Sequence, residues 1–198
     1  MEIERKYDVD DLAALPDWTA LPGVAVVGAA EIRELDAQYL DTADRSLARS
    51  GFALRRRSGG PDEGWHIKGP LVDGGRVEQH WPLGDARDAS VVPPAILAAL
   101  SPVTTEPLLP LARIRNARTA YALRAADGGL VAEFVDDRVR ATDQRSGVER
   151  AWREWEFELG AAAPADPASL FAAADDAITA VGGRPAGSAS KLARALGA

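Results

Sequence analysis

The first residues of the chain alternate in charge in a way that few folds can accommodate. Positions 2 to 6 read Glu-Ile-Glu-Arg-Lys. On a β-strand, successive side chains point to opposite faces, so Glu2, Glu4 and Lys6 would share one face. Two carboxylates and an ammonium are costly in a dry core. Such a face fits either a wet, charged cavity that holds a metal ion and an anion, or a solvated edge strand.

The same period of two recurs near the other end of the chain, at residues 154–159. Glu154, Glu156 and Glu158 fall on one face and three large apolar residues fall on the other. This contrast predicts a strand with one buried face. Carboxylates spaced along strands are oxygen ligands suited to Mg²⁺, Mn²⁺ or Ca²⁺. A solvent-exposed sheet face explains each strand singly, but it explains less well why basic residues are patterned in the same way.

Basic residues also alternate on several segments. They are Arg55 and Arg57, His66 and Lys68, Arg76 with Glu78, and a cluster of Arg113, Arg115 and Arg118. Guanidinium groups bind phosphate oxygens through paired hydrogen bonds, and lysine adds a compact charge. A cavity with carboxylates on some strands and basic residues on others can hold a metal–polyphosphate complex. Random surface salt bridging is the alternative, since 27% of the residues are charged.

The order of patterns along the chain predicts many strands with helices at the connections. We expect strands near 2–9, 23–28, 30–41, 52–58, 64–68, 75–82, 109–125, 129–142 and 148–160, and helices near 10–15, within 85–100, from 166 and over 188–196. Antiparallel strands with alternate charged residues favour a closed barrel with a polar interior.

Composition argues against other kinds of site. The formal net charge of −7 argues against a nucleic-acid-binding surface. The chain has no cysteine, and its two histidines, His66 and His80, argue against a histidine-rich zinc site. No apolar run has the length of a membrane span, and charged residues begin at position 2, which argues against a signal peptide. We therefore expect a soluble, cytoplasmic protein.

A set of short motifs resembles the CYTH superfamily, the triphosphate tunnel metalloenzymes. These are Glu2-x-Glu4-x-Lys6, Tyr39-Leu40-Asp41-Thr42, Arg55-x-Arg57, His66-Ile67-Lys68-Gly69-Pro70, Arg118 eight residues after Pro110, Glu156-x-Glu158-Leu159, and Ser190-Lys191. The resemblance extends from residue 2 to about residue 194. It implies an α+β fold in a single domain over residues 1–198, with a closed eight-stranded antiparallel β-barrel forming a tunnel and helices packed outside.

The resemblance also implies roles for individual side chains. The implied metal ligands are Glu2, Glu4, Glu78, Asp137, Glu156 and Glu158. The implied catalytic and substrate-binding residues are Lys6, Arg55, Arg57, Lys68, Arg118 and Lys191, with Arg113 and Arg115 as additional substrate contacts. For Arg113 and Arg115, pairing with neighbouring carboxylates is the alternative. Asp136 and Asp137 are neighbours on a predicted strand, so only one of them can face the interior of the barrel. Alternation along the strand favours Asp137 if Glu133 also faces the interior.

The implied function is metal-dependent hydrolysis of a triphosphate with Mg²⁺ or Mn²⁺ as cofactor. We expect inorganic triphosphate to be cleaved to pyrophosphate and phosphate, because no element suited to a base is visible in the sequence. Adenylyl cyclase, thiamine triphosphatase and a non-catalytic polyphosphate-binding module are the alternatives. The expected partners are a triphosphate or polyphosphate and, in a longer parent chain, a CHAD domain, whereas nucleic acids and membranes are not expected.

Overall fold

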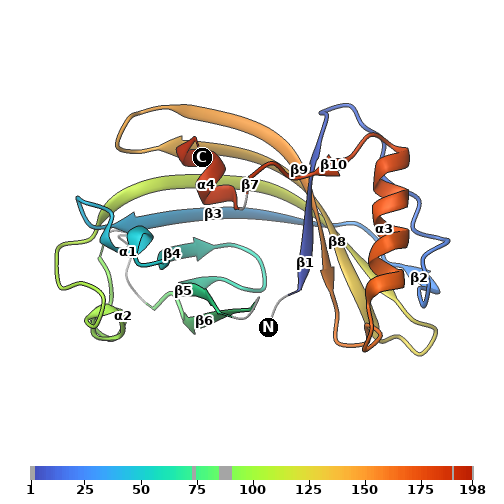
Figure 1. Ribbon diagram of the computed structural model, residues 1–198, viewed down its shortest axis with the longest axis horizontal. Coiled ribbons are helices and arrows are strands. Elements are labelled where there is room, and N and C mark those ends of the chain that lie inside the picture. Colours follow the sequence, from blue (N-terminus) through green and yellow to red (C-terminus); the bar gives the residue numbers. More distant parts are fainter. Residues whose placement is uncertain (1–2, 73–74, 85–90, 189, 198) are drawn as a thin grey trace.

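The computed structural model describes residues 3–72, 75–84, 91–188 and 190–197 (Figure 1). The strands are β1 (Glu4–Val9), β2 (Val26–Val27), β3 (Glu31–Asp41), β4 (Ala53–Ser58), β5 (Gly64–Val72), β6 (Gly75–Trp81), β7 (Leu109–Arg124), β8 (Leu130–Asp143), β9 (Glu149–Leu159) and β10 (Arg184–Pro185). The helices are α1 (Ser46–Arg49), α2 (Pro94–Leu100), α3 (Ala168–Ala180) and α4 (Lys191–Leu196).

One antiparallel sheet forms the framework of the molecule. Its 10 strands run in the order β10-β1-β9-β8-β7-β3-β4-β5-β6, and β2 pairs with β7. The long strands β3, β7, β8 and β9 arch over β4, β5 and β6, so that the sheet curves around its inner face (Figure 1). The prediction of an antiparallel sheet with helices is therefore confirmed, but α4 lies on the inner face of the sheet and not outside it.

The closed eight-stranded barrel is wrong in both closure and strand number. Within the described ranges, hydrogen bonds do not join β6 back to β1. Part of the edge of β1 that such a pairing would use is occupied, because Tyr7 and Asp8 pair with Pro185 and Arg184 of β10. The backbone N–H of Ala186 extends this contact by donating to the carbonyl of Lys6 at 2.9 Å. The short β10 segment is thus the edge strand on this side of the sheet.

The apolar residues of β9 bury the outer face of the sheet under α3. Trp155 and Phe157 are fully buried there, together with Leu170 and Ile178 from the helix and Phe134 from β8. Burying side chains of this size contributes about 1.5–3 kcal/mol each. Because the period of a strand is two, this packing turns the alternate residues of β9 to the inner face. The carboxylates at 154, 156 and 158 are those residues.

Two smaller cores place the remaining helices. The first contains Leu47 of α1, Ile96 and Leu100 of α2, and Leu54 and Trp65 from β4 and β5. The second lies on the inner face of the sheet, where Ala195 of α4 packs against residues of β3, β7 and β8. The hydroxyl of Ser190 caps α4 by accepting from the N–H of Ala193 at 3.1 Å. This helix therefore carries Lys191 into the concave side of the sheet.

The helix expected near residues 10–15 is absent, and its carbonyls have another partner. Nη1 of Arg153 donates to the carbonyls of Asp10, Asp11 and Ala13 at 3.2, 3.0 and 2.9 Å. A helix would use such carbonyls for its own i→i+4 ladder. Of the helix expected within 85–100, α2 accounts for residues 94–100, and residues 85–90 lie outside the described residues. Across the described parts of the chain, every helix is too short or too polar to span a membrane.

Candidate active site

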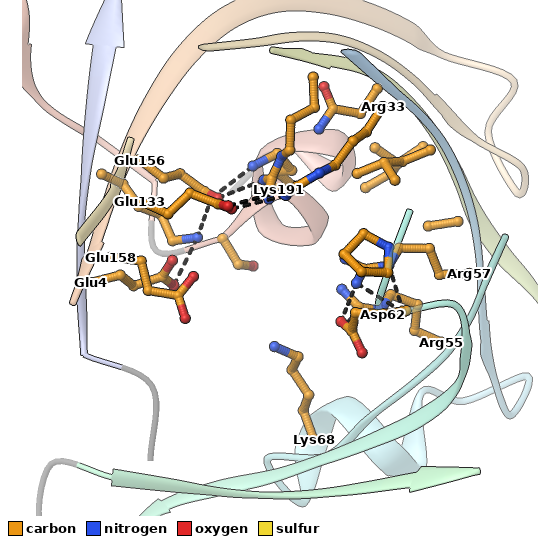
Figure 2. Close-up of a pocket in the computed structure, with 18 of the residues that line it drawn as sticks. Glu4, Arg33, Arg55, Arg57, Asp62, Lys68, Glu133, Glu156, Glu158 and Lys191 are labelled. Atoms are coloured by element: carbon orange, nitrogen blue, oxygen red, sulfur yellow. Dashed lines mark hydrogen bonds and ion pairs between the residues drawn. The ribbon is translucent and has the colours of Figure 1, made fainter. Parts of the chain in front are cut away.

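A cavity of about 340 Å³ opens on the inner face of the curved sheet. Its charged lining consists of Glu4, Asp62, Glu133, Glu156 and Glu158 and of Lys6, Arg33, Arg55, Arg57, Lys68, Arg118 and Lys191. The glutamates come from β1, β8 and β9 and gather on one side, whereas Arg55 and Arg57 of β4 lie across the open space from them (Figure 2). The cavity thus has an acidic wall and a basic wall.

The acidic wall contains one row of carboxylates. Glu4 of β1 is the direct partner of Glu158 on β9, and Glu158 is the direct partner of Glu133 on β8. Direct partners on antiparallel strands hold their Cβ atoms about 4.5–5.5 Å apart, and like charges at such positions destabilise the sheet. Arg33 offsets part of this charge through hydrogen bonds of 2.9 and 3.0 Å to Glu133, and Nζ of Lys6 lies 3.0 Å from Glu4. We call Glu4, Glu133 and Glu158 the acidic row.

Glu156 is the inward-facing residue of β9 that precedes Glu158. It lies deeper in the cavity wall than the acidic row and contacts three cations. Its carboxylate oxygens lie 2.5 Å from Nζ of Lys6, 2.7 Å from Nζ of Lys191 and 2.7 Å from Nη2 of Arg118. Burial alone would raise the pKa of Glu156, but the charges of Lys191, Lys6 and Arg118 hold it well below its usual range. Glu156 is therefore ionised and fixes the positions of three basic side chains at the cavity.

Lys191 occupies the centre of a second acidic cluster. Carboxylate oxygens of Asp137, Glu154 and Glu156 all lie within 4.8 Å of one another. The ammonium of Lys191 is 2.9, 2.5 and 2.7 Å from these three groups in turn. Burial lowers the pKa of Lys191, but the surrounding carboxylates more than offset this effect and raise it. The cation in this cluster is thus an ammonium that the protein itself supplies.

The basic wall holds two arginines that repel each other. Arg55 and Arg57 are two residues apart on β4, so they share its inner face. Burial, followed by the charge of Arg55, lowers the pKa of Arg57. Arg57 donates to the carboxylate of Asp62 in the turn after β4, and Arg55 lies 3.8 Å from the same group. Lys68 of β5 points toward the open space below them (Figure 2).

A family comparison settles what kind of protein this is. The family model described as the CYTH domain matches residues 1–194. The chain belongs to the CYTH domain family. This CYTH chain is also 37% identical over 209 aligned residues to two uncharacterised Mycobacterium tuberculosis proteins, Rv2226 and MT2285, one from each of two strains. The alignment covers 100% of this chain but 40% of each relative, so the chain spans about two fifths of their length.

Solved structures show the same fold. A Bacillus halodurans protein provisionally named an adenylate cyclase matches with a TM-score of 0.63 and 17% identity, over 98% of this chain and 96% of its own. A Hippeastrum protein, provisionally named an adenylyl cyclase but with a dominant triphosphatase activity, matches with a TM-score of 0.59 and 18% identity, over 99% and 95%. Identities this low support the shared fold alone.

The two acidic groups differ in how well they suit the divalent metal expected for this CYTH domain. The acidic row presents carboxylates from three neighbouring strands to the cavity, and a hard cation prefers such oxygen ligands. A metal ion there would compete with Lys6 for Glu4 and with Arg33 for Glu133. In the cluster around Lys191, the ammonium lies within 2.9 Å of all three carboxylates, so a metal ion there would have to displace it. Glu156 and Asp137, both expected as metal ligands, contact Arg118 and Lys191 in the structure, and their role as ligands stays a prediction.

The other predicted residues fall in different places. Lys6, Arg55, Arg57, Lys68, Arg118 and Lys191 all line the cavity with Glu4, Glu156 and Glu158. Glu78 is set back from it, where it contacts His66 and Lys68 at 2.8 and 3.2 Å. Burial raises the pKa of Glu78, but the hydrogen bond from His66 and the charge of Lys68 bring it down to about 2. Glu2 lies outside the described residues.

Arg113 and Arg115 do not line the cavity, which corrects their expected role as substrate contacts. Ile114 and Asn116 of β7 line it, so the odd-numbered neighbours point to the opposite face. Arg113 lies 2.6 Å from Asp36 there, and Arg115 is 3.7 Å from the same carboxylate with 64% of its side chain exposed. Both contacts match the alternative expected from the sequence, which was pairing with a neighbouring carboxylate.

Several residues that line the cavity were not predicted from the sequence. Arg33 is the direct partner of Arg118 across β3 and β7 and shares its face. Asn116 precedes Arg118 by two residues, is 5% exposed, and its Oδ1 has no hydrogen-bond partner among the described residues. Because alternate residues of a strand share a face, counting two residues back from Arg118 would have identified Asn116. Asp62 lies in a turn, where strand parity gives no signal.

Proposed function

We propose that this CYTH protein hydrolyses a triphosphate in the cavity, with inorganic triphosphate as the preferred substrate and a divalent metal, Mg²⁺ or Mn²⁺, as cofactor. The observation that carries the proposal is the division of one cavity into an acidic row and a basic wall. A polyphosphate chain with bound metal has the complementary arrangement of charge, because the cation can lie at the row while phosphate oxygens contact the guanidiniums.

The acidic row would hold the metal, with Glu4 and Glu158 as its central pair. Bound there, a divalent ion would supply Lewis-acid neutralisation of phosphate charge. Arg55, Arg57 and Lys68 would bind and orient the phosphate chain from the opposite wall. No protein nucleophile is required, because in phosphoryl transfer to water the protein contributes mainly positioning and charge stabilisation.

The basic residues on the acidic side would act as a fixed second set of contacts. Glu156 holds Lys6, Arg118 and Lys191 within 2.7 Å of its oxygens. Side chains held in this way lose little conformational entropy when a phosphate binds, and donors that need no reorganisation stabilise developing charge best. The acidic neighbours of Lys6, Arg118 and Lys191 would therefore assist catalysis by preorganising cations.

A triphosphate with an organic substituent is the second candidate, and one observation favours it. Leu35, Ala37 and Tyr39 of β3, together with Ile114 and Asn116 of β7, form a less charged part of the lining. An aromatic ring and an amide oxygen without a hydrogen-bond partner among the described residues are groups that can bind heterocycles. Adenylyl cyclase or thiamine triphosphatase activity would use this wall, which was not visible in the sequence. A polyphosphate-binding module would use the charged walls alone, and a CHAD partner in a longer chain stays a prediction.

Competition kinetics test the proposal. We would compare kcat/KM for inorganic triphosphate, ATP and thiamine triphosphate at one concentration of Mg²⁺ and then of Mn²⁺, and analyse the products. The expected result is a higher kcat/KM for inorganic triphosphate with pyrophosphate and phosphate as products. Preference for ATP with cyclic AMP as product would support the cyclase, and tight binding of triphosphate with no turnover would support the binding module.

A pair of arginine variants tests the assignment of the basic wall. Arg55→Gln removes a guanidinium inside the cavity, and Arg113→Gln makes the same chemical change outside it. A hydrogen bond to a charged group is worth about 1.5–3 kcal/mol, so Arg55→Gln should lower kcat/KM by about 10- to 150-fold. Arg113→Gln should leave kcat/KM unchanged. Equal losses in the two variants would contradict the proposed wall.

A further inference from the structure

The two histidines of the chain lie side by side, and the proposed function uses neither of them. His66 on β5 is the direct antiparallel partner of His80 on β6. Their ring centroids are 4.7 Å apart. Asp62 lies in the turn before β5, and one ligand atom from each of the three residues lies within 4.8 Å of the others. Two imidazoles and a carboxylate thus converge at the base of the β5–β6 hairpin.

Hydrogen bonds fix which nitrogen of His66 faces this cluster. Nδ1 lies 2.8 Å from Oε1 of Glu78, which as an ionised carboxylate can only accept. In a neutral ring Nδ1 therefore carries the proton, and the lone pair is on Nε2. Nε2 lies 3.2 Å from the carbonyl of Asp62 and 3.6 Å from its carboxylate, which are acceptors as well. A carboxylate behind one nitrogen and a lone pair on the other is the arrangement found for histidines that ligate metals.

The position of His80 depends on a glycine. A Cβ on Gly64 would lie 2.2 Å from Nε2 of His80 and 2.4 Å from the carbonyl of Trp81. Gly64 also has a φ of +149°, which side chains rarely adopt. The absence of a side chain at this position lets the imidazole lie over the turn that carries Asp62. Its Nε2 there faces a further acceptor, the carbonyl of Glu63 at 3.0 Å.

We propose that Asp62, His66 and His80 bind a divalent transition-metal ion of the Zn²⁺ class, at a site separate from the acidic row. Imidazole nitrogens favour zinc and its neighbours over Mg²⁺, and two histidines with one carboxylate leave coordination positions for water or a further ligand. His66 is buried and held by Glu78, so it provides the fixed ligand. His80 is exposed and can rotate toward the ion. Asp62 is exposed as well, and because Arg57 contacts its Oδ2, it would bind the ion through Oδ1, at about 2.0–2.2 Å.

Zinc titration of the chain tests this site independently of any enzyme activity. The metal-free 198-residue protein would be titrated with Zn²⁺ by calorimetry in excess Mg²⁺, which occupies oxygen-rich sites, while NMR follows the imidazole resonances. His80→Ala and Asp62→Asn remove exposed ligands and should leave the fold intact, as circular dichroism would show. Gln79→Ala alters an exposed residue next to His80 and is the matched control.

The expected result is one Zn²⁺ site whose binding shifts the resonances of both histidines, with an affinity that falls by about 100-fold or more in each ligand variant and stays unchanged in Gln79→Ala. Loss of a ligand should exceed the 10- to 100-fold effect of losing an outer hydrogen bond. Wild-type affinity in His80→Ala, or Zn²⁺ binding that leaves the imidazole resonances unmoved, would overturn the proposal.

Discussion

Replacing Lys191 with methionine should destabilise the protein, because it removes the cation from the centre of three carboxylates. Met has nearly the length of Lys, so the change is mainly one of charge. Asp137, Glu154 and Glu156 would remain within 4.8 Å of one another without the ammonium that now lies within 2.9 Å of each. Removing one partner of a buried ion pair costs about 3–5 kcal/mol. For a chain of this size, that corresponds to a fall in Tm of about 6–20 °C.

The pH dependence identifies the cause of the loss. The charges of Lys191 and Arg118 outweigh burial and hold the pKa of Asp137 below its ordinary value, and the pKa of Glu156 is held low as well. A carboxylate with a lowered pKa contributes stability above its unfolded pKa, and the contribution disappears as the pH falls through the folded pKa. The difference between wild type and Lys191→Met should therefore be large at pH 7.5 and shrink at pH 4 and below.

Urea denaturation at several pH values measures this difference directly. Arg113→Met is the matched control, because it removes a cation whose ion pair with Asp36 is exposed, and exposed pairs contribute little. A Lys191→Met protein with wild-type stability at pH 7.5 would refute the argument that Lys191 neutralises the cluster. A loss of stability that does not change with pH would point to packing of α4 instead of charge.

Three further predictions follow from the site. Glu4→Gln should raise the metal concentration needed for half-maximal activity by more than about tenfold, as activity assays would show. A melting curve should show an unchanged thermal transition, whereas an unfolded variant would indicate that Glu4 has a structural role. Asp62→Asn should lower KM for triphosphate by up to about fivefold, because it removes a partly exposed carboxylate that competes with the substrate for Arg57. An increase in KM would place Asp62 among the substrate contacts. Gly64→Ala should lower the free energy of unfolding by about 1–3 kcal/mol, since its φ of +149° and the nearby His80 both disfavour a Cβ; urea denaturation with wild-type stability would contradict this.

The sequence predicted the site best where charge alternates along a strand. Glu156 and Glu158 could be assigned to one face of β9 because Trp155 and Phe157 are strongly apolar neighbours. The same rule, applied to β7, would have separated Arg113 from Arg118, since residues an odd number apart point to opposite faces. Grouping the arginines by proximity instead of parity led to the wrong expectation.

Other features depend on contacts that no local pattern encodes. Tyr7 and Asp8 of β1 pair with Pro185 and Arg184, which are more than 170 residues away in the sequence, so β10 and not β6 lies beside β1. Which cation fills the Asp137 cluster is likewise set by where α4 packs on the inner face. A carboxylate has the same local signal whether it faces a metal or an ammonium, so the sequence could not separate the acidic row from this cluster.

The sign of the charge reverses between the whole molecule and its cavity. The chain has a formal net charge of −7, yet the cavity is lined by seven basic and five acidic side chains. At long range the protein therefore repels a free polyphosphate, and attraction begins only within about a Debye length of the lining, roughly 8 Å at physiological salt. Bound metal reduces the negative charge of the incoming anion and thus its long-range repulsion. For the triphosphate substrate that we propose, this charge distribution favours entry of the metal complex over the free anion.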